Sequence, residues 1–121
     1  MNVLVWVGVA ALGGFGALLR FFVDGIVAGR SARDFPLGTF VVNVTGALVL
    51  GLLVGLAFGG DRLTLVGTAT LGSYTTFSTW MLETHRLVEE GELPNATANV
   101  LVSLAVGLGA AALGRVIGAH L

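Results

Sequence analysis

Residues 71–83, which read LGSYTTFSTWMLE, place a dense polar cluster inside a strongly apolar part of the chain. Serine and threonine occupy five of the seven positions from Ser73 to Thr79. Their hydroxyl groups offer the backbone alternative hydrogen bonds, and Gly72 adds conformational freedom. We therefore expect a membrane-spanning helix to break between Gly72 and Thr79. Non-helical backbone at this depth must be buried in protein or line a cavity, where freed carbonyls can hold a cation and hydroxyls an anion.

The whole chain is too apolar for an ordinary soluble domain. Only 11% of its 121 residues are charged, against about a quarter in soluble domains. A net charge of -1 argues against a nucleic-acid-binding protein. Without cysteine there is no disulfide, thiolate metal site or thiol nucleophile. No nucleophile–base pair, metal cluster or phosphate loop indicates an enzyme.

Four apolar runs predict the architecture, since a helix needs about 20 apolar residues to cross a bilayer. We expect an all-α integral membrane protein with a single domain, residues 1–121, and with both termini on one side. The expected spans are residues 3–23, 37–58, 63–82 and 96–117.

Charged side chains are nearly absent from these runs. Arg20 and Arg115 are the charged residues inside them, each near an end. Arg20 has two interpretations: a snorkelling side chain paired with Asp24, or a positive charge in a vestibule that attracts anions. No carboxylate lies inside a run, which argues against a small proton-coupled multidrug exporter.

The loop arginines give little preference for one orientation. Three lie on one side (Arg30, Arg33 and Arg86), and Arg62 and Arg115 lie on the other. Since basic loop residues set membrane topology, we expect insertion in both orientations, which makes an antiparallel dimer possible.

Neutral polar residues also repeat at four-residue spacing. Thr39 and Asn43 share one face of the second run, and Asn99 and Ser103 share one face of the fourth. These faces are either interhelical contacts or a narrow polar lining. Small residues at the same spacing, listed here, predict tight helix packing within or between chains: Ala10/Gly14, Gly51/Gly55/Gly59 and Gly114/Gly118.

Three motifs resemble the signatures of the Fluc/CrcB fluoride channels, in the same order and over essentially the whole chain. They are GGFGALLRF (13–21), GTFVVNVTGALVLG (38–51) and GSYTTFSTW (72–80). The resemblance implies a dual-topology antiparallel dimer with two pores and a structural sodium ion at its centre. Backbone carbonyls of Gly72 and Thr75 would hold the sodium. The implied fluoride pathway comprises Arg20, Asn43, Phe77, Ser78, Thr79, Trp80 and Ser103.

The function implied by this resemblance is passive, selective export of fluoride through the cell (inner) membrane of a prokaryote. Many donors would replace the water of the ion: hydroxyls, the Asn43 amide and positive aromatic edges. Position 80 departs from the family, which usually has phenylalanine there. Trp80 keeps an aromatic edge and adds an N–H donor and bulk. Some relatives form heterodimers, so both a homodimer and a heterodimer remain open. A non-conducting membrane assembly subunit is the remaining alternative.

Overall fold

The computed structural model describes residues 2–30 and 35–121, and every regular element in them is helical. Three helices are long: α1 (Val3–Arg30), α2 (Leu37–Gly55) and α6 (Leu93–Ala119). The segment between α2 and α6 contains four shorter elements. They are α3 (Gly60–Arg62), the π-helix η1 (Leu63–Leu71), α4 (Gly72–Tyr74) and α5 (Ser78–Glu89).

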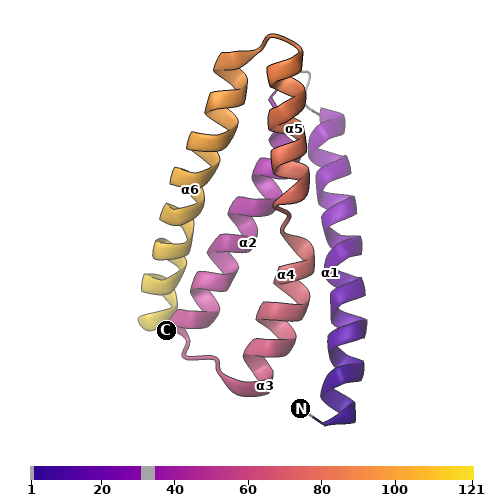
Figure 1. Ribbon diagram of the computed structural model, residues 1–121. Coiled ribbons are helices and arrows are strands. Elements are labelled where there is room, and N and C mark those ends of the chain that lie inside the picture. Colours follow the sequence, from indigo (N-terminus) through magenta and orange to yellow (C-terminus); the bar gives the residue numbers. More distant parts are fainter. Residues whose placement is uncertain (1, 31–34) are drawn as a thin grey trace.

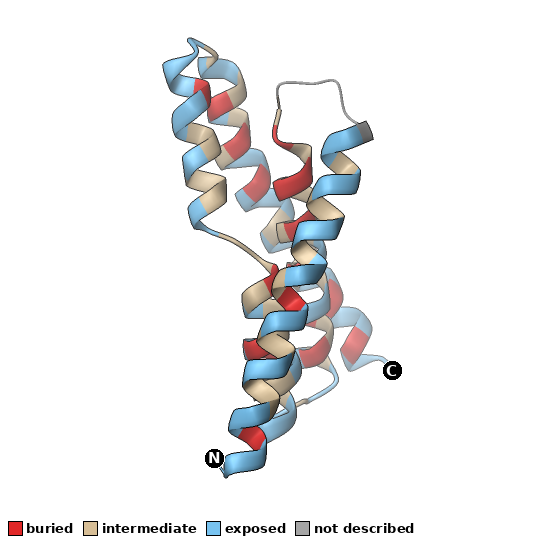
Figure 2. Cartoon of the chain, turned by 90° about the vertical axis from the view of Figure 1, so that its right-hand side faces the viewer, coloured by how far each residue is buried: buried red, intermediate tan, exposed pale blue. Residues whose placement is uncertain are grey.

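The long helices α1, α2 and α6 are each long and apolar enough to cross a membrane. Large apolar side chains such as Leu4 and Leu19 on α1 and Leu113 on α6 are exposed on these helices. Exposed residues recur along the whole length of α1, with intermediate and a few buried positions between them (Figure 2). An apolar exterior of this extent fits lipid rather than water, so the protein is a multi-pass membrane protein.

The shorter elements run as one broken rod beside the long helices (Figure 1). α1 packs against η1, α4 and α2, while α6 packs along α2 and also contacts α5. The start of α1 and the end of α6 lie at the same end of the bundle, as expected for the two termini (Figure 1).

A glycine seam joins α2 to α6, and we define it as Gly51, Gly55, Gly114 and Gly118. A Cβ atom on any of these glycines would overlap backbone atoms of the opposite helix. Small residues allow such close approach in lipid. The predicted tight packing at these positions is therefore contact within one chain, whereas Gly14 has open space around it.

The helix is interrupted at Thr75, Thr76 and Phe77, inside the interval predicted from the hydroxyl cluster. α4 ends at Tyr74, and Thr75 has the extended angles φ -80° and ψ 162°. The Thr75 amide makes the last helical hydrogen bond, to the Leu71 carbonyl at 2.9 Å. Helical bonding resumes where the Met81 amide donates to the Phe77 carbonyl at 3.0 Å.

A tight turn then brings α6 back against α5. Gly91 adopts φ +76°, and its amide donates to the Val88 carbonyl at 3.1 Å. The next amide, of Glu92, donates to the Leu87 carbonyl at 2.8 Å. This pair of bonds is the Schellman arrangement, in which glycine at the left-handed position ends the helix. It places the start of α6 beside the end of α5.

Candidate functional site

The side chain of Asn43 holds the interrupted backbone in place. Its Nδ2 donates to the Thr76 carbonyl at 2.9 Å, and its Oδ1 accepts from the Thr76 amide at 2.8 Å. An unpaired backbone group in a low-dielectric interior costs about 1–3 kcal/mol. One asparagine on α2 thus satisfies both polar groups of the residue at the centre of the break.

The break leaves four backbone carbonyls, those of residues 72–75, without their helical partners, and two of them belong to Gly72 and Thr75. In a continuous helix the Thr76 amide would bind the Gly72 carbonyl, and here it binds Asn43. The Thr79 amide would bind the Thr75 carbonyl, but it donates instead to the Thr76 hydroxyl at 3.2 Å. The carbonyls of Gly72 and Thr75 are therefore available to another partner, and these are the two that the resemblance assigns to sodium.

An open groove of about 650 Å³ runs beside the break. α2, η1, the break and α6 form it, and none of the residues that line it is charged. It brings together six of the predicted site residues: Asn43, Gly72, Thr75, Phe77, Trp80 and Ser103.

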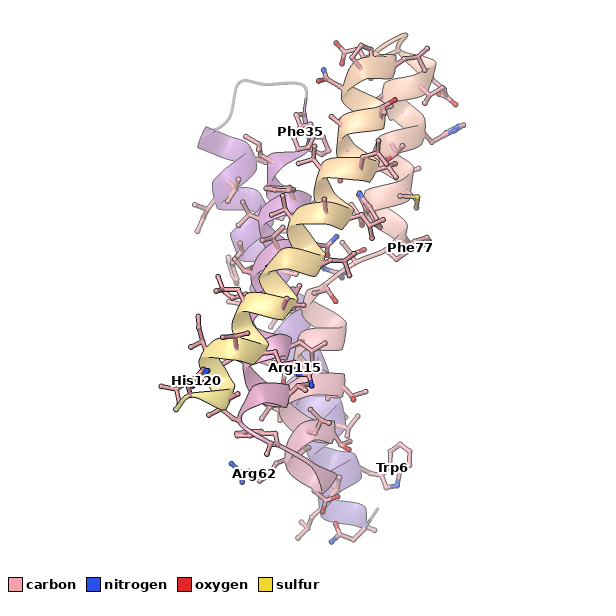
Figure 3. The ribbon with its side chains drawn as sticks, turned by 90° about the vertical axis from the view of Figure 1, so that its left-hand side faces the viewer. Trp6, Phe35, Arg62, Phe77, Arg115 and His120 are labelled. Atoms are coloured by element: carbon pink, nitrogen blue, oxygen red, sulfur yellow. The ribbon has the colours of Figure 1, made fainter. Side chains whose placement is uncertain are left out.

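Two aromatic rings lie at the upper part of this groove. Phe77 is at the break between α4 and α5 (Figure 3), and its side chain is largely exposed. The rings of Phe77 and Trp80 meet edge to face, with centroids 5.9 Å apart and planes at 85°. The Trp80 indole N–H donates to the Asn99 carbonyl on α6 at 2.9 Å. The extra donor of tryptophan is therefore used inside the protein.

A second cavity, of about 320 Å³, lies between α1, α2 and the break. Its lining includes Arg20, Asp24, Thr39 and Thr79. Within the described residues, Arg20 makes no ion pair with Asp24, so the structure does not show the paired interpretation of Arg20. The buried Thr39 hydroxyl instead donates to the carboxylate of Glu83 on α5.

The predicted residues thus divide between two places. Six line the groove, Arg20 and Thr79 line the second cavity, and Ser78 is exposed and lines neither. Sequence reasoning assigned no role to the Thr39–Glu83 contact or to the hydrogen bond between the Thr45 hydroxyl and the Tyr74 hydroxyl at 2.9 Å. The four-residue spacing of Thr39 and Asn43 indicates that both lie on one face of a helix. It does not predict which residues they bind.

Comparison with known proteins gives the family. A family model described as "CrcB-like protein, Camphor Resistance (CrcB)" matches residues 7–115. The chain belongs to the CrcB-like family. This membership agrees with the resemblance in the three motifs, and the CrcB-like chain has relatives that are similar over nearly all of its length.

Three of these relatives carry the name fluoride-specific ion channel FluC. One from Mycolicibacterium paratuberculosis is 58% identical over 114 residues, covering 94% of this chain and 93% of the relative. One from Mycobacterium bovis is 54% identical over 115 residues, covering 95% and 91%. One from Symbiobacterium thermophilum is 41% identical over 119 residues, covering 93% and 96%. These CrcB-like relatives are channels by name, and the chain is not an enzyme.

Proposed function

We propose that the protein is a passive, fluoride-selective ion channel. Relatives that are named fluoride-specific ion channels support fluoride as the transported ion. The uncharged groove supports passive transport. Several hydrogen-bond donors and aromatic edges meet in that groove, where no lining residue is charged. An ion bound by neutral groups can leave as well as enter. The groove is the observation that carries this proposal.

The chemistry of the lining suits a small, strongly hydrated anion. The Ser103 hydroxyl is buried in the wall of the groove and makes no hydrogen bond within the described chain, so it can donate to an anion. The Phe77 ring offers a positive edge. The Nδ2 and Oδ1 atoms of Asn43 both bind Thr76, so Asn43 supports the break. One N–H of its side-chain amide remains for the pathway. Arg20 in the second cavity supplies a positive charge that draws anions toward the break.

We propose that a second, oppositely oriented copy covers the groove and that the pair contains two pores. One chain leaves the groove open along the break, so a pathway needs another wall. Arg62 and Arg115 lie at the same end of the bundle (Figure 3), and Arg86 lies in α5. Arg33 and the Arg30 side chain, which enter the predicted arginine split, lie outside the described residues.

In this proposal the segment from η1 through α5 acts as one broken span, which gives four spans in total. A structural sodium ion would lie between the two copies, in the inner (plasma) membrane of a bacterial cell. The fit rests on the Gly72 and Thr75 carbonyls, which lack their helical amides and belong to residues that line the groove. Carbonyl oxygens suit such a cation. Within the described chain no group of His, Cys, Asp and Glu side chains could hold a metal, so backbone oxygens are the available ligands.

Flux from liposomes that contain this protein alone tests the channel. Fluoride should leave down its own gradient once a potassium ionophore cancels the membrane potential, with no proton gradient applied. Chloride efflux should stay at the level of empty liposomes. Fluoride flux that required a proton gradient would favour an exporter, and well-folded dimers without any flux would favour a non-conducting subunit or a heterodimer.

Sodium exchange tests the ion separately from conduction. Purified dimers should unfold at a lower temperature, or separate, when an organic cation of similar concentration replaces sodium, because a ligand of the folded state stabilises it by mass action. Equal stability in both salts would rule out the sodium site and leave the fluoride pathway unaffected.

A further inference from the structure

Trp80 and Asn99 bind each other in both directions, and we call this pair of contacts the α5–α6 bracket. The indole N–H of Trp80 donates to the Asn99 carbonyl at 2.9 Å. In return, Asn99 Nδ2 donates to the Trp80 carbonyl at 3.3 Å and to the Thr84 hydroxyl at 2.8 Å. We infer that Asn99 is a positioning residue, which fixes the Trp80 indole beside Phe77 and thereby sets the lining of the pathway.

The orientation of the Asn99 amide follows from its partners. The Thr84 hydroxyl donates its single hydrogen to the Trp80 carbonyl at 2.9 Å. It can therefore only accept from Asn99, so the NH₂ group must face Thr84 and the oxygen must face away. Both amide hydrogens of Asn99 are then used, and its Oδ1 is buried without a partner.

This arrangement changes what Trp80 offers to an ion. Its N–H is engaged by the Asn99 carbonyl on α6, so the part of Trp80 that lines the groove offers an aromatic ring without a free N–H, as phenylalanine would. Asn99 is fully buried and does not line the groove. Asn99 therefore acts on the pathway through Trp80 and not by touching the ion. This inference rests on the proposed fluoride pathway.

The test combines flux with fluorescence of Trp80. The chain has two tryptophans, and Trp6 lies on the outer face of α1, 60% exposed (Figure 3). Trp6→Phe therefore leaves Trp80 as the single tryptophan, which can be excited apart from Tyr74 at long wavelength, with the interior unchanged. In this background Asn99→Leu removes the amide and keeps the branching and the number of side-chain heavy atoms. Thr97→Val, on an exposed part of the same helix, is the matched control.

Asn99→Leu should lower fluoride flux about tenfold where Trp80 is present, and by less than about twofold where Trp80→Phe has removed the indole. Acrylamide should quench Trp80 fluorescence more strongly in Asn99→Leu, because the indole is no longer fixed. Thr97→Val should change neither value. Thr84→Val removes the hydroxyl that accepts from Asn99 and donates to the Trp80 carbonyl, but it leaves both Trp80–Asn99 contacts in place. It should show the same dependence on Trp80 at about threefold, and it serves if Asn99→Leu does not fold.

Equal losses of flux with Trp80 and with Phe at position 80 would overturn the inference, since they would show a general structural role. Unchanged flux and quenching in Asn99→Leu would also overturn it. If the Trp6→Phe parent carries no fluoride while forming stable dimers, the proposed function fails, and the quenching result alone then decides whether Asn99 fixes the indole.

Discussion

Asn43 pairs with both backbone polar groups of Thr76, donating to its carbonyl at 2.9 Å and accepting from its amide at 2.8 Å. A single side chain on α2 therefore satisfies both polar groups of the residue at the centre of the break. Because the Thr76 amide is diverted, the Gly72 carbonyl is left for another ligand. The proposed sodium site thus depends on Asn43 without Asn43 touching the ion.

Replacing Asn43 with leucine should destabilise the protein, since it leaves two buried backbone groups without partners at about 1–3 kcal/mol each. The stabilisation by sodium should also decrease, because the free Thr76 amide can turn back to the Gly72 carbonyl. Thermal unfolding in detergent, with and without sodium, measures both effects. Asn95→Leu, at the start of α6 and away from the break, is the control. A sodium response in Asn43→Leu equal to that of the parent would contradict the proposed link.

The glycine seam gives a prediction about packing. Gly114→Ala should destabilise the protein by about 1–3 kcal/mol, because the new Cβ would overlap the Leu48 backbone and push α2 from α6. Gly109 lies on the same helix with nothing within 4 Å of an added Cβ. Gly109→Ala should be neutral or stabilising, by up to about 1 kcal/mol. The midpoints of thermal unfolding compare the two variants, and a similar loss in both would show that the seam is not close-packed.

Phe77→Ile should reduce fluoride flux by about tenfold or more while dimers still form, because it removes an aromatic edge and keeps an apolar side chain. Liposome efflux is the measurement. Phe22→Ile, on the exposed face of α1, removes a ring that faces lipid and should leave flux unchanged. Trp80→Phe should keep at least about half the flux, since the indole N–H is engaged by Asn99. Undiminished flux in Phe77→Ile would remove that ring from the pathway.

Added lysines should select one orientation in the membrane. Gly59→Lys with Asp61→Lys should keep the loop before α3 in the cytoplasm, because basic residues in short loops are retained there. Reporter fusions at the C-terminus should then change from two topologies to one, and fluoride flux from this variant alone should fall.

The complementary change lies at the other end of the bundle, in the pair Glu89→Lys and Glu90→Lys, where α5 ends at Glu89 and Glu90 caps it. Coexpression of the two locked variants should restore flux, whereas the neutral pair Gly59→Ser and Asp61→Asn should behave as the parent. Full flux from one locked variant expressed alone would contradict the antiparallel homodimer.

Local properties of the sequence predicted the three long helices and a non-helical stretch after Gly72. The third expected span, residues 63–82, is divided among shorter elements and is not one of the long apolar helices of the described chain. Apolar runs gave the long helices, although α1 continues to Arg30 beyond the predicted limit at residue 23. Gly72 and the hydroxyl cluster located the interruption, because the side chains of poor helix formers offer the nearby backbone hydrogen bonds that compete with the helix. Such signals depend only on neighbouring residues, so one sequence suffices to show them.

Partners distant in the sequence could not be predicted in the same way. Asn43 and Thr76 are 33 residues apart, and Trp80 and Asn99 are 19 apart. Their pairing depends on how α2 and α6 lie against the break, which four-residue spacing does not specify. The π-helical form of η1 was also not predicted, since its apolar sequence suits an ordinary α-helix equally well. The seam glycines likewise suggested close contact but not which helix they would meet.

The bond between Asn43 and Thr76 also bears on the order of assembly. The central residue of the break has its polar groups satisfied inside a single chain, so a newly inserted copy carries no unpaired amide or carbonyl at Thr76 into the lipid. In the proposed antiparallel dimer, each copy would bring Thr76 already paired to the encounter, and the carbonyls of Gly72 and Thr75 would be left for the contact to satisfy. Under this proposal, translation of the two copies need not be coupled, and the rate of their encounter would set how quickly dimers accumulate.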